Sequence, residues 1–94
     1  MHFCYILYST KRNRYYTGET TDVDARLLYH NSSELNTNST KAGIPWEIVL
    51  IIPCENRSHA LKVEMHIKRM KSKRFIESLI QYPELVHKII TLNQ

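Results

Sequence analysis

Two short stretches near the N-terminus, Phe3-Cys4-Tyr5 and Tyr16-Thr17-Gly18, decide how this chain folds. The first lies in residues 2–9, which are rich in aromatic and branched side chains and apolar on both faces, a pattern that predicts a central strand covered on both sides. The second lies in a returning strand over 14–19, after a short polar turn. Strands joined this closely form an antiparallel hairpin. We therefore expect the two tyrosines to be neighbours.

The composition indicates one small folded domain. With 94 residues, 43% of them apolar, the chain has room for one sheet and a few helices around a modest core. Its net charge of +4 favours a polyanionic partner, either nucleic acid or an anionic membrane surface. Its two cysteines are too few and too far apart for a zinc site. We expect neither a signal peptide nor a membrane span, and hence a cytoplasmic protein.

Beyond the hairpin, the pattern predicts a helix, a loop and a third strand. Thr21-Asp22 can cap a helix over about 22–31, because both side chains accept hydrogen bonds from the first helical amides. Residues 31–43 are rich in asparagine, serine and threonine, which predicts a long surface loop prone to disorder or suited to gripping a ligand. The third strand is expected over Trp46 to Ile52, where Pro53 would stop it.

The C-terminal half is predicted to be helical, over about 58–71, from Ser72 onward, and from Pro83 to about 91. The expected buried stripes of the first two helices are Ala60, Val63, Ile67 and Met70, and Phe75, Ile76, Leu79 and Ile80. The predicted order is β-β-α-β-α-α plus a C-terminal helix, an α+β fold around a small three-stranded, mainly antiparallel sheet. A single domain would span 1–94, with its core over about 2–80 and a helical extension over about 83–92.

Three side chains outside the hairpin are candidates for a functional site. Arg26 and His30 lie one helical turn apart on the face that carries Val23. Glu64 falls within the apolar stripe of its helix, where burying an unpaired carboxylate would cost several kcal/mol, so we expect a cation partner. Structural explanations stay open: the tyrosines as core, Arg26 and His30 as a solvent-edge pair, and Glu64 in a salt bridge.

A run of cations directly follows Glu64 and is the place where a nuclease would hold a phosphate backbone. A solvated helix face is the ordinary explanation for such a run. The candidate nucleic-acid contacts, with two cations from earlier in the chain, are Arg14, Lys41, Lys68, Arg69, Lys71, Lys73 and Arg74.

Together these motifs carry a family resemblance, through residues 3–5, 16–27, 30–31, 45–47 and 60–64. Over roughly residues 2–80 the chain resembles the GIY-YIG nuclease superfamily. It looks closest to the short stand-alone bacterial members related to the N-terminal cleavage domain of the excision-repair nuclease. The resemblance implies a three-stranded antiparallel sheet flanked by helices.

The resemblance also implies a role for each candidate residue. The matching catalytic positions are Tyr5, Tyr16, Arg26, His30 and Glu64. Glu64 would be the sole carboxylate ligand of a divalent metal, Mg²⁺ or Mn²⁺, which keeps most of its sites for water and phosphate oxygens. Arg26 would fork onto a phosphate oxygen. Either Tyr16 or His30 would act as general base, and the sequence does not choose between them.

The chain departs from the family pattern at four positions. Phe3 and Cys4 replace the glycine and isoleucine of the first motif, and Thr17 replaces the isoleucine of the second. Glu19 stands where some members carry lysine. This acid could repel phosphate, act as a second acid near the metal, or pair with a nearby arginine.

We therefore expect a metal-dependent DNA endonuclease. Because no separate sequence-reading domain is present, single-stranded or structured DNA in repair or recombination is the expected substrate. One alternative is a nucleic-acid-binding module with weak or no activity, motivated by Glu19 close to Tyr16. Another is a protein-interaction domain whose basic helix docks an acidic partner.

Overall fold

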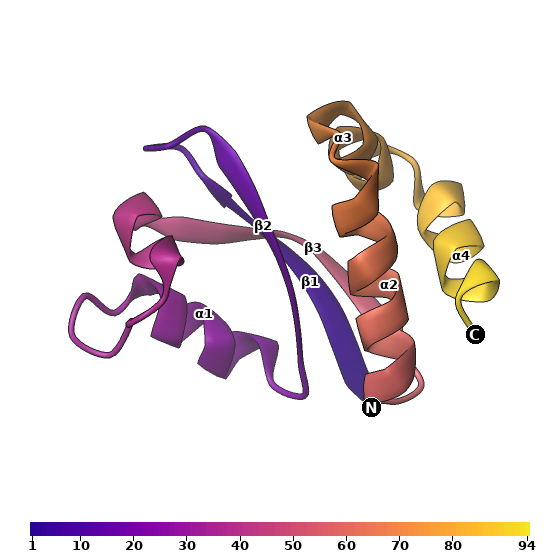
Figure 1. Cartoon of the computed structure of the whole chain (residues 1–94), viewed down its shortest axis with the longest axis horizontal. Coiled ribbons are helices and arrows are strands. Elements are labelled where there is room, and N and C mark those ends of the chain that lie inside the picture. The colour runs from indigo at the N-terminus through magenta and orange to yellow at the C-terminus, as the bar shows by residue number, and fades with distance from the viewer.

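The computed structural model describes residues 1–94 and has the predicted order of strands and helices, with one short 3₁₀ helix added (Figure 1). The elements are β1 (His2–Ser9), β2 (Arg14–Thr20), α1 (Val23–Asn31), the 3₁₀ helix η1 (Ser39–Gly43), β3 (Trp46–Cys54), α2 (Arg57–Met70), α3 (Lys73–Gln81) and α4 (Pro83–Leu92). The fold is α+β, as predicted. None of its helices is both long enough and apolar enough to cross a membrane.

The three strands form one antiparallel sheet in the order β2-β1-β3. The predicted central position of β1 is confirmed, and its middle residues are fully buried. In the hairpin, Tyr5 lies opposite Gly18 and Leu7 lies opposite Tyr16. Because residues two positions apart share a face of a strand, Tyr5, Leu7 and Tyr16 all point to the same side of the sheet.

Helices cover both faces of the sheet, with α1 and η1 on one side and α2, α3 and α4 on the other (Figure 1). The larger core lies under the C-terminal helices and contains Cys4, Ile6, Ile52, Cys54, Ala60, Val63, Ile67, Leu79 and Ile89. The smaller core lies under α1 and contains Tyr5, Leu7, Val23 and Trp46. Alternation along β1 therefore sends Tyr5 to the α1 side and its neighbour Cys4 to the α2 side.

The structure corrects three details of the predicted elements. Strand β3 does not stop at Pro53 but continues to Cys54, with Pro53 exposed and opposite Phe3. Proline is tolerated there because β3 is an edge strand, where a missing N–H can face away from the sheet. Met70 is 46% exposed and Ile80 is 38% exposed, so neither belongs to a buried stripe. Both lie in the last turn of their helices, beyond the contacts that bury the middle of each helix.

The segment 31–43, predicted as a surface loop, is instead fixed against the fold. Asn36 and Thr40 within it are buried, and its last residues form η1. The Asn31 side chain pairs with the backbone of Trp46, accepting from its N–H at 2.6 Å and donating to its carbonyl at 2.9 Å. The indole Nε1 of Trp46 donates to the carbonyl of Thr40 at 2.7 Å. The polar side chains of this segment thus hold it against β3.

Candidate active site

Tyr5, Tyr16 and His30 form one aromatic cluster between the sheet and α1. The ring centroids of Tyr5 and Tyr16 are 6.3 Å apart, and those of Tyr16 and His30 are 4.8 Å apart. Tyr5 Oη lies 3.0 Å from His30 Nε2, within hydrogen-bond distance. Tyr5 and His30 are 1% and 0% exposed, whereas Tyr16 is half-buried. The predicted neighbourhood of the two tyrosines is confirmed, and Tyr16 is the one that reaches the surface.

Gly18 leaves the space that the Tyr5 ring occupies. A Cβ atom at Gly18 would lie 2.6 Å from Tyr5 Oη and 2.7 Å from its Cζ, closer than such contacts allow. The two residues face each other across the hairpin. Since Tyr5 is buried and cannot move aside, glycine at this position is a packing requirement of the site.

Arg26 comes from α1, one turn before His30, and lies next to the hairpin tyrosines. Its guanidinium carbon lies 4.6 Å from the centroid of the Tyr29 ring, a cation–π contact. The nearby Tyr5 hydroxyl raises the pKa of Arg26, which keeps the guanidinium charged. Arg26 is partly exposed and is absent from the ion pairs of the structure. It therefore offers an uncompensated positive charge to an anion.

Burial keeps Tyr5 and His30 neutral. It raises the pKa of Tyr5, an effect that the Arg26 guanidinium opposes. Burial, together with the positive charge of Arg26, lowers the pKa of His30 from 6.5 to about 4. His30 is thus a neutral, buried imidazole near neutral pH and not the solvent-edge residue that its helix position allowed.

Two residues of the 31–43 segment form hydrogen bonds with His30. Thr40 Oγ1 lies 2.8 Å from His30 Nδ1. Asn36 Nδ2 donates to Thr40 Oγ1 at 2.9 Å and to the His30 carbonyl at 2.8 Å. Neither Asn36 nor Thr40 was predicted as a site residue, because a run of asparagine, serine and threonine carries no periodic signal that marks individual residues as buried.

Glu64 lies on α2, which covers the other face of the sheet (Figure 1). Its predicted cation partner is Lys68, whose Nζ lies 3.5 Å from a carboxylate oxygen, and its side chain is 16% exposed. Glu64 forms no hydrogen bond with the tyrosines, but its charge is close enough to contribute to the raised pKa of Tyr5. The structure thus brings Tyr5, Tyr16, Arg26 and His30 together and places Glu64 nearby, across β2.

The donor set at Glu64 fits a loosely held divalent ion. No three His, Cys, Asp or Glu side chains come together as a metal cage. One carboxylate gives a hard cation a single anionic oxygen ligand, and its remaining positions can be filled by water and by phosphate oxygens. Such an arrangement suits Mg²⁺ or Mn²⁺ bound together with substrate.

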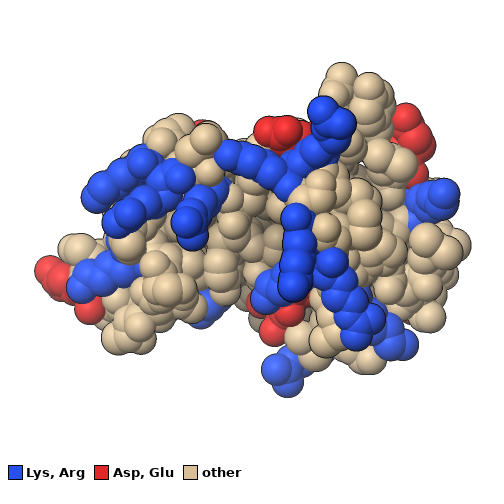
Figure 2. All heavy atoms as spheres, turned by 45° about the horizontal axis from the view of Figure 1, so that its top comes forward, with Lys and Arg blue, Asp and Glu red and all other residues tan.

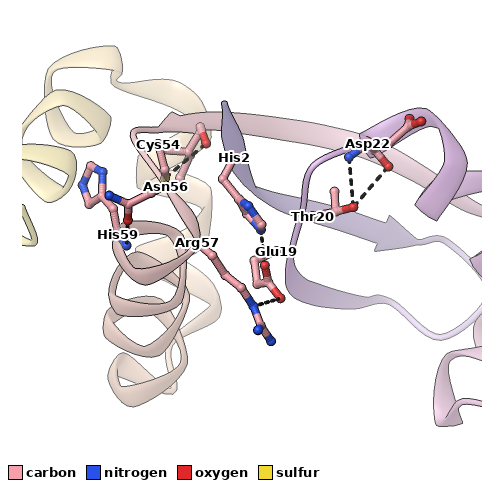
Figure 3. A network of polar contacts seen from close by, with 9 residues as sticks. His2, Glu19, Thr20, Asp22, Cys54, Asn56, Arg57 and His59 are labelled. Carbon is pink, nitrogen blue, oxygen red and sulfur yellow. Dashed lines mark hydrogen bonds and ion pairs between the residues drawn. The ribbon is translucent and has the colours of Figure 1, made fainter.

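Glu19 points toward His2 and Arg57 (Figure 3). It lies an odd number of positions from Tyr16 along β2 and therefore on the opposite face of the sheet. There its carboxylate pairs with His2 and lies 3.8 Å from Arg57 Nε. Of the three roles open from sequence, pairing with an arginine is the observed one.

Two basic grooves meet at the start of β2. The β2–α2 groove, of about 410 Å³, lies between residues 13–17 and the α2–α3 corner, and its cations are Arg14, Lys68, Lys71 and Lys73. The β2–η1 groove, of about 370 Å³, lies between the same strand and η1, and its cations are Arg12 and Arg14. Tyr15 and Tyr16 line both grooves. In Figure 2, lysine and arginine side chains gather in groups on one face, with uncharged surface between them.

The candidate nucleic-acid contacts are thus divided. Four line the β2–α2 groove, while Arg69 lines a separate hollow beside Met65. Lys41 and Arg74 are exposed but line neither groove. Arg12, which was not among the predicted contacts, lines the β2–η1 groove and donates from Nε to the carbonyl of Ala42 at 3.1 Å. A cation in a hairpin turn gave no sequence signal for this position.

Comparison with known proteins identifies the family. Residues 1–76 match the GIY-YIG catalytic domain, so the chain belongs to the GIY-YIG family, a class of nuclease domains. It is 31% identical over 83 residues to a UPF0213 protein of Syntrophus aciditrophicus, an alignment that covers 88% of this chain and 94% of the relative. A UPF0213 protein of Listeria monocytogenes serotype 4b is 36% identical, with 88% and 91% covered. No solved structure matches the chain. The family resemblance drawn from the sequence is confirmed.

Proposed function

We propose that this chain is a metal-dependent endonuclease that hydrolyses phosphodiester bonds in DNA. The observation that carries the proposal is the clustering of Tyr5, Tyr16, Arg26 and His30, in which Tyr16 lines two basic grooves. A phosphate bound beside Tyr16 would have a half-buried phenol next to it and the guanidinium of Arg26 close by. Charge stabilisation and a positioned proton acceptor are the two requirements of phosphodiester hydrolysis.

Arg26 is assigned to the scissile phosphate. Its guanidinium is charged and free of carboxylate partners, and Tyr29 supports it from one side. A planar guanidinium can donate two parallel hydrogen bonds to phosphate oxygens, which a lysine ammonium cannot reproduce. Arg26 would thereby orient the phosphate and offset the charge that builds up on it.

Tyr16 is assigned to the attacking water, as its proton acceptor or its positioner. It is the half-buried member of the cluster and lines both grooves, so water and substrate can reach it. Tyr5 and His30 are buried beneath it and would hold the cluster in place.

Glu64 would hold the divalent ion, Mg²⁺ or Mn²⁺. When bound, such an ion supplies positive charge to the leaving oxygen. Lys68, whose Nζ lies 3.5 Å from the carboxylate of Glu64, lines the β2–α2 groove, which supports a role for Glu64 beside that groove.

Single-stranded or structured DNA is the proposed substrate, with repair or recombination as its setting. The grooves are small, basic and lined by Tyr15 and Tyr16, and aromatic side chains stack on unpaired bases. We also propose a single domain over 1–94 located in the cytoplasm, where the two buried free thiols of Cys4 and Cys54 would stay reduced.

The test is a cleavage assay on single-stranded, duplex, flapped and branched DNA with Mg²⁺ or Mn²⁺. The wild type should cut at least one substrate, and EDTA should stop it. Glu64→Gln should abolish cleavage while leaving the fold intact. Glu84→Gln, on exposed α4 outside the family match, is the matched control and should cut normally. Salt-sensitive binding without turnover would favour the non-catalytic binding module instead, and equal cleavage by Glu64→Gln would reject the assigned site.

A further inference from the structure

The orientation of the buried Asn36 amide is fixed by backbone groups. Its Oδ1 accepts from the N–H of Asn38 at 2.7 Å, and its Nδ2 donates to the carbonyl of His30 at 2.8 Å. A backbone N–H can only donate and a carbonyl can only accept, so the two ends of the amide cannot be exchanged. The second Nδ2 hydrogen therefore points to Thr40 Oγ1, 2.9 Å away.

The hydroxyl hydrogen of Thr40 then has one destination. Thr40 is 4% exposed, and Oγ1 contacts only Asn36 Nδ2, which donates to it, and His30 Nδ1 at 2.8 Å. Donation to Nδ1 satisfies both atoms. If Nδ1 carried the proton instead, two donors would converge on Oγ1 and the Thr40 hydrogen would be buried without an acceptor, an unfavourable arrangement.

We infer that Asn36 and Thr40 are positioning residues that hold His30 with its proton on Nε2, so that His30 donates a hydrogen bond to Tyr5 Oη. The 3.0 Å contact between His30 and Tyr5 thereby acquires a direction. A donor at this position opposes burial, which is the main cause of the raised pKa of Tyr5. The Arg26 guanidinium next to Tyr5 acts in the same sense.

The assignment removes His30 as general base. Nδ1 is occupied by the Thr40 hydroxyl, and Nε2 already carries a proton and faces a buried tyrosine. The low pKa of His30 means that the ring is neutral near neutral pH and carries a single proton, which is the proton assigned here to Nε2. Of the two candidates for the proton acceptor, Tyr16 and His30, Tyr16 then remains. This catalytic consequence rests on the proposed nuclease function, whereas the position of the proton on His30 does not.

The direct test is a ¹H–¹⁵N long-range NMR spectrum of the histidine rings in the full chain near neutral pH. His30 should show a protonated Nε2 and an unprotonated, hydrogen-bonded Nδ1. Thr40→Val keeps the side-chain shape and removes the donor, so the folded variant should lose this pattern. Thr40→Ser should restore it, and Thr91→Val on α4 should leave it unchanged. A protonated Nδ1 in the wild type, or an unchanged His30 pattern in folded Thr40→Val, would overturn the inference. The wild-type spectrum decides even if Thr40→Val does not fold.

The catalytic consequence is tested on the best DNA substrate of the cleavage panel. Thr40→Val should lower kcat about tenfold or more with KM little changed, because misplaced catalytic groups lose rate rather than binding. Thr40→Ser should recover most of kcat. The pH profile of kcat in the wild type should lack an inflection near the ordinary histidine pKa. An inflection there that moves in Thr40→Val would identify His30 as the base and refute the assignment of the proton acceptor to a tyrosine. If wild type cuts no DNA, the proposed function fails while the NMR result still stands.

Discussion

The buried neutral imidazole of His30 makes stability depend on pH in a defined window. In the unfolded chain a histidine takes up a proton below pH 6.5, whereas His30 in the fold does so only below about pH 4. Between these values the unfolded state binds the extra proton, so the free energy of unfolding falls as pH falls. At about 1.4 kcal/mol per pH unit, the window corresponds to about 3 kcal/mol, fully retained above pH 6.5 and lost by about pH 4.

The assay is urea unfolding of wild type and His30→Gln, followed by the fluorescence of the single tryptophan. Glutamine does not titrate, so carboxylates shared by both proteins cancel in the comparison. Between neutral pH and about pH 4 the wild type should lose about 3 kcal/mol more than the variant, whatever the constant cost of the substitution. Burial is the main cause of the lowered pKa of His30, and Arg26 is the charged residue that adds to the effect. Exposed His87→Gln on α4 should keep the wild-type slope. Parallel curves for wild type and His30→Gln would refute the reasoning.

Three further predictions concern the site and its grooves. Gly18→Ala should lower the free energy of unfolding by about 1–3 kcal/mol and abolish cleavage, because its Cβ would meet Tyr5 Oη at 2.6 Å. Adding Tyr5→Leu to Gly18→Ala should recover part of the stability in thermal melts. Full stability of Gly18→Ala would contradict the packing requirement. Arg26→Lys keeps the charge but not the fork, so it should lose most of its turnover with little change in melting temperature; near-normal turnover would reject a forked phosphate contact. Lys71→Met should reduce the salt dependence of DNA binding, by about 0.7 in the log–log slope for a single strand, more than Arg69→Met does, as measured by fluorescence anisotropy; equal effects would place the strand elsewhere.

The hairpin and the helix order could be predicted because they rest on local periodicity. Alternation along residues 2–9 marks a strand covered on both faces, and a short turn leaves an antiparallel partner as the only option. Helical spacing likewise put Arg26 and His30 on one face. It also placed Glu64 in an apolar stripe, which predicted a cation partner, and that partner is Lys68. These inferences need only contacts between near neighbours in the chain.

The surroundings of His30 could not be predicted, because they depend on contacts between distant segments. Thr40 and Asn36 look like ordinary loop residues until the pairing of Asn31 with Trp46 folds their segment back. Glu19 shows the same limit. Its partners, His2 and Arg57, come from β1 and α2, and sequence spacing alone could not choose among its possible roles.

The way the 31–43 segment is fixed divides it into two parts that differ in their tolerance to engineering. Residues 33–35 are exposed, whereas Asn36, Thr40 and Gly43 are buried against the site. Exposed loop tips are where proteins accept inserted sequence. Residues 33–35 are therefore the part of the segment where an inserted peptide tag or DNA-reading module should be tolerated best. The linkers of such an insert would have to preserve the turn in which the Asn36 N–H donates to the Ser32 carbonyl at 3.0 Å, because Asn36 anchors the segment beside His30.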